Sequence, residues 1–326
     1  ITDELIEEAI EKNIDLIITH HPLIFSALKS ITDDSVMGKK IIKLMKHNIN
    51  VYTSHTNLDS ADGGLNDYLA ELIGLDRVSY LEKVYSEKYY KLTTFVPHEN
   101  AENVRMAVCD SGAGNIGDYS DCSFSLEGSG TFRPLEGSNP HIGTNGVLEK
   151  VDETRQEFVV NESDLSKAIQ ALISSHPYET PAYDLIKLEN EIESYGIARY
   201  GFLEKAMTTE EFIEHVKEKL KIPFVKLVGS PEGKVFKVAL CTGAGADYIR
   251  AAKHLNCDIY ITGDTKYHEG QLASEIGLKV LDTGHYETEA IYMERLKEIL
   301  ARACEKKDYD VKIIVAETCT NFFKYF

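Results

Sequence analysis

Short apolar runs, each followed by a polar loop and an amphipathic helix, constrain the fold of this chain more than any other feature. Two of these runs lie near the N-terminus, IDLIIT (14–19) and INVYTS (49–54), and helical patterns follow them at 37–48 and 64–73. Strands that are apolar on both faces belong to parallel sheets covered by helices. The first part of the chain therefore predicts an α/β layer.

The same pattern returns near the C-terminus. The apolar runs there are VFKVALCT (235–242), CDIYIT (257–262), LKVLDT (278–283) and VKIIVA (311–316), with helices expected at 246–255, at 269–276 and up to about residue 304. We expect the two ends of the chain to form two halves of one α/β layer.

The chain opens on a helical pattern at residues 1–12, in which Leu5, Ile6 and Ala9 share one face. A helix that opens an α/β domain usually follows a strand. We therefore expect the natural protein to have a further segment before this helix.

The middle of the chain has a different pattern. It predicts strand 89–96, helix 99–111, strands 121–133 and 145–160, helix 162–174 and strand 182–189. This β-α-β-β-α-β order is typical of a ferredoxin-like module. The expected domains are a first α/β half (1–89), an inserted ferredoxin-like domain (90–190) and a second α/β half (191–326).

The charge of the chain excludes some classes of partner. Acidic residues outnumber basic ones 53 to 35, for a net charge of -18. General nucleic-acid binding and anionic membranes require a surplus of Lys and Arg, whereas one small anionic substrate can be held by a local site. The 6 cysteines form no C-x-x-C pair, and neither a membrane span nor a signal peptide is visible. We expect a cytoplasmic protein with reduced thiols.

Side chains able to bind a metal follow several strands at the point where each strand ends. They are His20 and His21 after 14–19, His55 and Asp59 after 49–54, Asp264 and His268 after 257–262, and His285 and Glu289 after 278–283. In open parallel sheets, ligands bind beyond the carboxyl ends of the strands. Imidazole and carboxylate together suit Zn, Mn, Fe or Ni, and a bridging acid suits a two-metal centre.

Each of these residues also has an ordinary structural interpretation. A strand-end His pair can be structural, an Asp in a TNLD loop can be a helix cap, and a Glu in a first turn complements the helix dipole. Convergence on one edge of the sheet favours the metal site. The GAGAD stretch (243–247) lacks the third glycine of a dinucleotide fingerprint, so it predicts a tight turn whose amides could still hold a phosphate.

At these residues the chain resembles the Nif-three-like family, whose members are often named GTP cyclohydrolase I type 2 homologues. The matching stretches are DLIITHHPLIF (15–25), SHTNLDSADGGLND (54–67), CTGAGAD (241–247) and YITGDTKYHEGQLASEIGLKVLDTGHYETE (260–289).

The resemblance implies a dinuclear metal centre with zinc as the first expectation and Mn, Fe or Ni as alternatives. Its ligands would be His20, His21, Asp59, His285 and Glu289. Glu289 would bridge the two ions, with His21 and Asp59 on one and His20 and His285 on the other. Glu287 matches no family ligand.

The stretch SSHPYETPAYDLIKLE (174–189) is similar to the end of a CutA-like or PII-like domain, as in longer bacterial members of the family. Those proteins resemble toroidal homohexamers with metal centres that face an internal cavity. A homohexamer is therefore the assembly that the resemblance implies.

The resemblance favours metal-assisted hydrolysis of a nucleotide or another small anionic substrate, with GTP ring opening as the family's label. His268 is the candidate proton shuttle. The alternative interpretation is that it lies at the rim of the site and only hydrogen-bonds to the backbone. Two alternatives stay open: a non-enzymatic, metal-dependent regulator or scaffold whose insert senses a ligand or partner, and a protein of metal storage or delivery.

Overall fold

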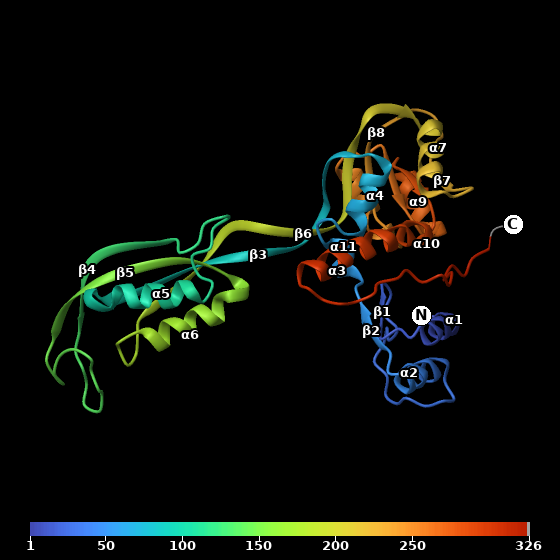
Figure 1. Cartoon of the computed structure of the whole chain (residues 1–326). Coiled ribbons are helices and arrows are strands. Elements are labelled where there is room, and N and C mark those ends of the chain that lie inside the picture. The colour runs from blue at the N-terminus through green and yellow to red at the C-terminus, as the bar shows by residue number, and fades with distance from the viewer. Residues whose placement is uncertain (325–326) are drawn as a thin grey trace. The chain divides into compact units, whose positions relative to one another are not determined.

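The computed structural model describes residues 1–324, apart from the side chains of residues 86 and 191–194. The chain forms two compact units, one of Ile1–Val84 with Tyr195–Phe326 and one of Tyr85–Ser194. Two long strands, β3 (Asp76–Pro97) and β6 (Tyr183–Thr208), contribute residues to both units (Figure 1). The boundaries expected from the sequence, 89/90 and 190/191, fall inside these two strands.

The main sheet of the first unit contains three parallel strands, as the sequence predicts. They are β8 (Lys234–Leu240), β9 (Ile259–Thr262) and β10 (Lys279–Asp282). Strand β6 pairs antiparallel with β8 on one side, and the short β7 (Lys226–Val228) pairs antiparallel with β10 on the other. All four residues of β9 are buried, which is why its sequence shows no polar alternation.

Helices cover both faces of this sheet. Helices α4 (Leu65–Ile73) and α7 (Thr209–Leu220) pack on one face, where Val238 and Leu240 lie in their core cluster. Helices α8 (Ile249–His254) and α9 (Tyr267–Glu275) pack on the other face, with Ala239 and Cys241 in their core cluster. Alternate residues of one strand thus enter different cores, because successive side chains of a strand point to opposite faces.

The N-terminal strands form a sheet of their own, which corrects the expectation of one shared layer. Strands β1 (Leu16–Thr19) and β2 (Asn50–Thr53) pair in parallel and only with each other. Helices α1 (Asp3–Glu11) and α2 (Val36–Lys46) cover one face of this sheet (Figure 1). The other face leaves Leu16 and Tyr52 exposed. The apolar runs predicted the two strands correctly. A local pattern does not determine which strands pair when they are far apart in the sequence.

The remaining elements of the first unit include short helices at the site. Helix α3 (Thr56–Ser60) precedes α4, and α10 (His285–Glu289) and α11 (Met293–Lys306) follow β10. Single 3-10 turns lie at Ala246–Tyr248 and Ala290–Tyr292. In residues 1–324, no helix combines the length and apolar character that a membrane crossing requires.

The stretch 311–316 forms no strand, which corrects the strand expected from VKIIVA. Val311 is 59% exposed, so this apolar run is not buried in a sheet. The chain beyond it is held at α1 instead, where the Glu8 carboxylate accepts the backbone N–H groups of Glu317 and Thr318, each at 2.9 Å. Side-chain bonds to α1 thus replace ladder bonds in holding this segment.

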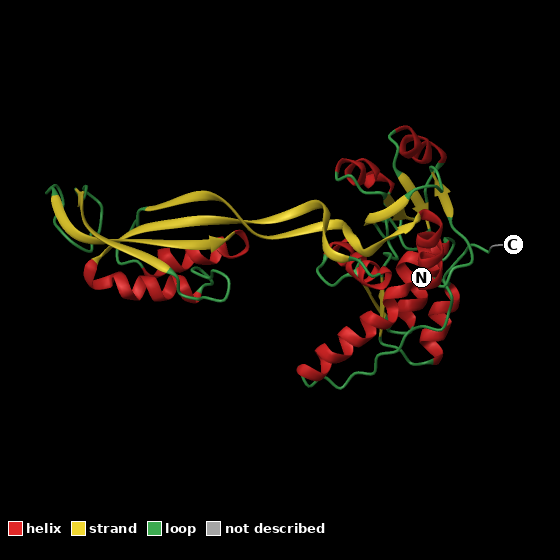
Figure 2. Cartoon of the chain, turned by 90° about the horizontal axis from the view of Figure 1, so that it is seen from above, coloured by secondary structure: helices red, strands yellow, loops and turns green. Residues whose placement is uncertain are grey.

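The second unit is built in the order β3, α5 (Ala101–Asp110), β4 (Ser123–Phe132), β5 (Glu149–Asn161), α6 (Leu165–Ser175), β6, with 3-10 turns at His98–Asn100 and Glu162–Asp164. This is the β-α-β-β-α-β order that the sequence predicts, and the sheet order is β4-β5-β3-β6. Both helices lie on one face of the strands and share a core with Leu92 and Phe158 (Figures 1 and 2).

The contact between Glu8 and the C-terminal segment gives a first prediction. Backbone bonds from Glu317, with Lys12 and Thr318, lower the pKa of Glu8 from 4.5 to about 2. A lowered carboxyl pKa means that the attachment is complete above about pH 4.5 and is lost as the pH falls towards 2. Glu8→Ala should therefore speed amide hydrogen exchange at residues 317 and 318 at neutral pH. The matched change Glu7→Ala should not, and unchanged exchange in Glu8→Ala would show that the carboxylate does not hold the segment.

Candidate metal centre

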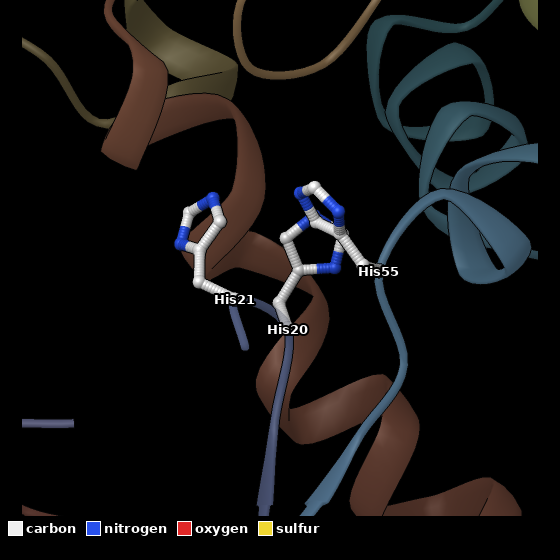
Figure 3. A group of neighbouring side chains, drawn as sticks. All are labelled: His20, His21 and His55. Atoms are coloured by element: carbon white, nitrogen blue, oxygen red, sulfur yellow. The ribbon is translucent and has the colours of Figure 1, made fainter. Parts of the chain in front are cut away.

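Three histidines lie at one edge of the two-stranded sheet. His20 and His21 follow the last residue of β1, and His55 comes two residues after the end of β2. Thr19 pairs with Thr53, so the two parallel strands end side by side and deliver their loops to the same place. Figure 3 shows the three rings gathered beyond the strand ends. Their centroids are 5.0–5.4 Å apart.

Hydrogen bonds to neighbouring groups orient the ring of His20 and that of a fourth histidine, His285. His20 Nδ1 lies 2.9 Å from the carbonyl oxygen of Ser54, so that ring nitrogen donates and Nε2 faces the cluster. His285 Nδ1 lies 2.8 Å from Asp264 Oδ2. A carboxylate or carbonyl behind the imidazole is the usual companion of a metal-binding histidine, because it fixes the tautomer and the ring orientation.

The carboxylate of Glu289 lies at the centre of the cluster. Helix α10 begins at His285 and ends at Glu289, and His285 Nε2 is 2.9 Å from Glu289 Oε1. The same oxygen is 3.5 Å from His20 Nε2, while Glu289 Oε2 is 3.3 Å from His21 Nε2. Each carboxylate oxygen therefore faces a different set of imidazoles, which is the arrangement that a bridging ligand needs.

The distances between possible ligand atoms fit a metal better than they fit hydrogen bonds. His20 Nε2 lies 3.6 Å from Asp59 Oδ1, and both atoms are buried without a hydrogen-bond partner. Buried polar atoms without a partner are rare in native proteins. Ligand atoms around one tetrahedral ion, with bonds of about 2.0–2.1 Å, lie roughly 3.3 Å apart. The 3.2 Å between His21 Nε2 and His285 Nε2 agrees with that spacing.

The ionisation of these groups also suits a cation. Burial alone would raise the pKa of Glu289, but the His20 and His285 imidazoles lower it to about 2. The Glu289 hydrogen bond raises the pKa of His285 to about 9, despite its burial. Burial raises the pKa of Asp59 to about 6 and lowers the pKa of His21. The cluster thus holds protons that a bound metal ion would replace.

A buried amide fixes the short helix α3, which carries Asp59. The Asn66 side chain is fully buried, donates to the Asp59 carbonyl at 3.0 Å and accepts the Thr242 N–H at 2.9 Å. It therefore ties the loop between β2 and α4 to the end of β8. This contact places a residue of the N-terminal part beside the main sheet.

The GAGAD stretch is a tight turn against the cluster. The Gly243 N–H donates to Thr288 Oγ1 at 2.9 Å, and the Gly245 N–H donates to Thr262 Oγ1 at 2.9 Å. These two amides are occupied within the protein, so they hold no phosphate in this conformation. A Cβ at Gly243 would overlap the Glu289 carboxylate, which explains a glycine there.

The structure brings the five ligands suggested by the family resemblance together and adds one residue. Groups with ligand atoms close enough for one ion are His20, His21 and His55, and His21, His285 and Glu289. His55 was not in the expected set, although its place after β2 matches that of His20 after β1. His268 is exposed on α9, and its described contacts are to Gln271 and Tyr267 of its own helix.

The fold and the site define an α/β protein with a His- and Glu-rich candidate metal centre. The chain belongs to the Duf34/NIF3 (NGG1p interacting factor 3) family, whose sequence profile matches residues 1–321. The resemblance seen in the sequence motifs is thereby confirmed.

Individual relatives are similar over the whole of this chain. The "GTP cyclohydrolase 1 type 2 homolog" of Bacillus subtilis is 45% identical over 325 residues, which are 100% of this chain and 87% of the relative. The protein of the same name from Halalkalibacterium halodurans is 42% identical with the same coverage. The crystal structure of a Bacillus cereus protein related to NIF3 matches with a TM-score of 0.83 and 41% identity, covering 100% of this chain and 87% of that chain.

The close approach of Gly243 to Glu289 gives a second prediction. Gly243→Ala should displace the carboxylate and lower the metal content of the protein by at least one ion per chain. Its φ of +63° adds strain of roughly 1–2 kcal/mol. Gly277→Ala is the matched control, because Gly277 has a φ of +69° and only a lysine tip near its Cβ position.

Elemental analysis with a thermal melt decides this prediction. Both variants should melt at lower temperature, and only Gly243→Ala should lose metal. Equal metal content in the two variants would contradict the role given to Gly243.

Proposed function

We propose that the cluster holds two divalent metal ions, with Glu289 shared between them. The observation that carries this proposal is the pair of buried, unpartnered atoms, His20 Nε2 and Asp59 Oδ1, beside a carboxylate whose two oxygens face different histidines. The possible ligands exceed the four that one tetrahedral ion takes. The resemblance implies His21 and Asp59 on one ion and His20 and His285 on the other, whereas the distances favour His21 with His285 on one ion and His20 with Asp59 on the other.

The donor atoms favour particular metals. Imidazole nitrogen and carboxylate oxygen suit Zn, Mn, Fe or Ni, and zinc is our first expectation. The nearby thiol of Cys241 is buried, and burial raises its pKa to about 12, so it stays protonated and is not proposed as a ligand. His55 offers one further imidazole close to those of His20 and His21.

The activity that this centre supports best is metal-dependent hydrolysis. Divalent ions bound there would polarise a substrate oxygen and lower the pKa of water towards neutrality. The protein's own contribution is to fix the ligands: Asp264 orients His285, Ser54 orients His20, and Asn66 holds helix α3, which carries Asp59. The name that the relatives carry makes GTP the first substrate to test.

His268 is proposed as the group that moves a proton. It follows β9, the strand next to β10, and its ring is exposed on α9. General acid–base catalysis by a positioned side chain contributes about 10²–10⁴-fold. His268→Ala should therefore lower turnover by about 10²-fold while both ions stay bound. The exposed His254→Ala is the control, and equal turnover in the two variants would leave His268 as a rim residue.

A further prediction tests the function itself. Full-length protein loaded with Zn or Mn should hydrolyse GTP, another nucleotide, a phosphoester or a cyclic amide. Asp59→Asn should lose both an ion and turnover, because the amide cannot replace an anionic ligand. If metal-loaded wild type hydrolyses none of these substrates between about pH 6 and 9, around the pKa of about 7 that metal-activated water reaches, the hydrolase proposal fails.

A metal-dependent regulator is the second candidate function. The observation that favours it is a cavity of ligand size in the inserted unit, far along the chain from the metal ligands. In that case the metal centre would stabilise the fold or an assembly, and ligand binding in the insert would be the regulated event.

A further inference from the structure

The second unit contains a cavity of about 590 Å³ that the metal chemistry does not use. Small-molecule sites measure about 300–1,000 Å³ and are mostly apolar, with a few polar groups. The walls here come from β4, β5, the loop that joins them and the HPYETP stretch after α6. Aromatic rings of Phe95, Phe132 and Tyr178 supply much of the apolar surface.

The HPYETP stretch is fixed by a buried histidine. His176 is 7% exposed, and its Nε2 lies 3.0 Å from the carbonyl oxygen of Phe95. Its Nδ1 accepts the N–H of Tyr178 at 3.0 Å. One nitrogen must therefore donate and the other accept, which holds His176 neutral and sets the position of Tyr178. The motif thus builds a rigid wall of the cavity.

Tyr178 in turn positions a carboxylate. Its ring meets Phe132 edge-on at 5.6 Å between centroids, and its hydroxyl donates to Glu153 Oε1 at 2.8 Å. The second oxygen, Glu153 Oε2, lies over the backbone of Gly130, where a Cβ would overlap it. The carboxylate is thus held beside aromatic rings with one oxygen committed to Tyr178.

The charge of the lining is negative. Glu127, Glu153 and Glu179 line the cavity, whereas its one guanidinium, that of Arg155, is already paired with Glu157 at 2.8 Å. A cation against aromatic faces and a carboxylate gains both cation–π and charge-assisted hydrogen-bond energy. Among the described residues, groupings with the spacing of metal ligands occur in the metal centre and not at this cavity. The cation that fits is therefore organic.

We propose that this cavity binds a small organic cation, an amine or amino-substituted ring, with its apolar body against Phe132 and Tyr178 and its N–H groups on Glu153. This site is independent of the metal centre and of the activity proposed for it.

The test uses three probes of one shape on the full chain: 2-phenylethylamine, 2-phenylethanol and 3-phenylpropanoate. Calorimetric titration, supported by saturation-transfer NMR, measures their binding. The amine should bind at least about tenfold more tightly than the alcohol, because one charge-assisted contact is worth roughly that factor. The anion should bind more weakly than both.

Variants identify the carboxylate that matters. Glu153→Gln keeps the shape and an acceptor for Tyr178, and it should weaken the amine about tenfold without changing the alcohol. Gly130→Ala should also weaken the amine, because the new Cβ displaces the carboxylate. Gly128→Ala on the same strand meets nothing within 4 Å and should bind like wild type. Glu99→Gln is the charge control, since this exposed acid lies outside the cavity.

Several results would overturn the proposal. These are no binding of the amine at millimolar concentration, equal binding of the amine and the anion, or an undiminished affinity in a folded Glu153→Gln protein. Circular dichroism and the metal content report whether each variant is folded, so a loss of affinity can be separated from a loss of structure.

Discussion

The carboxylate of Glu289, with only 12% of its side chain exposed, is the group on which the arrangement of the first unit depends. A charge removed from water is costly unless opposite charge and hydrogen bonds surround it. Here the imidazoles of His20, His21 and His285 approach it from two separate parts of the chain. The strand ends of the small N-terminal sheet and helix α10 are thereby brought to one point. Gly243 leaves the space in which the carboxylate lies.

Buried polar contacts outside the cluster hold these parts of the chain in fixed positions. Arg199 is 1% exposed, binds the Asp67 carboxylate and donates to the Ala61 carbonyl at 3.2 Å. Its guanidinium also lies over the Tyr80 ring at 4.5 Å. With Asn66, this residue fixes the loop between α3 and α4 to the main sheet. The short helix α3, which carries Asp59, is therefore held in place.

Local patterns predicted what is local and missed what depends on pairing. The apolar runs at 14–19 and 257–262 contain the strands β1 and β9, because a short run of apolar residues is enough to form a strand that is covered by helices. The run at 311–316 is also apolar, but it forms no strand, and the segment after it bonds to Glu8 of α1 instead. The local pattern also did not show that β1 and β2 form a sheet separate from the main one. His55 is among the residues that the sequence indicates as able to bind a metal, but it is not in the five-ligand set, and its place beside His20 and His21 follows from the register of β1 with β2. The cavity of the insert depends on contacts such as that of Tyr178 with Glu153, which no spacing in the sequence reveals.

The central claim is that two ions share Glu289, and diffraction at the absorption edge of the bound metal tests it most directly. Two anomalous peaks about 3.5–4 Å apart, as in two-metal sites, should lie on either side of the Glu289 carboxylate. His21 and His285 should contact one peak, and His20 and Asp59 the other. A single peak in fully loaded protein, or peaks that Glu289 does not touch, would contradict the account.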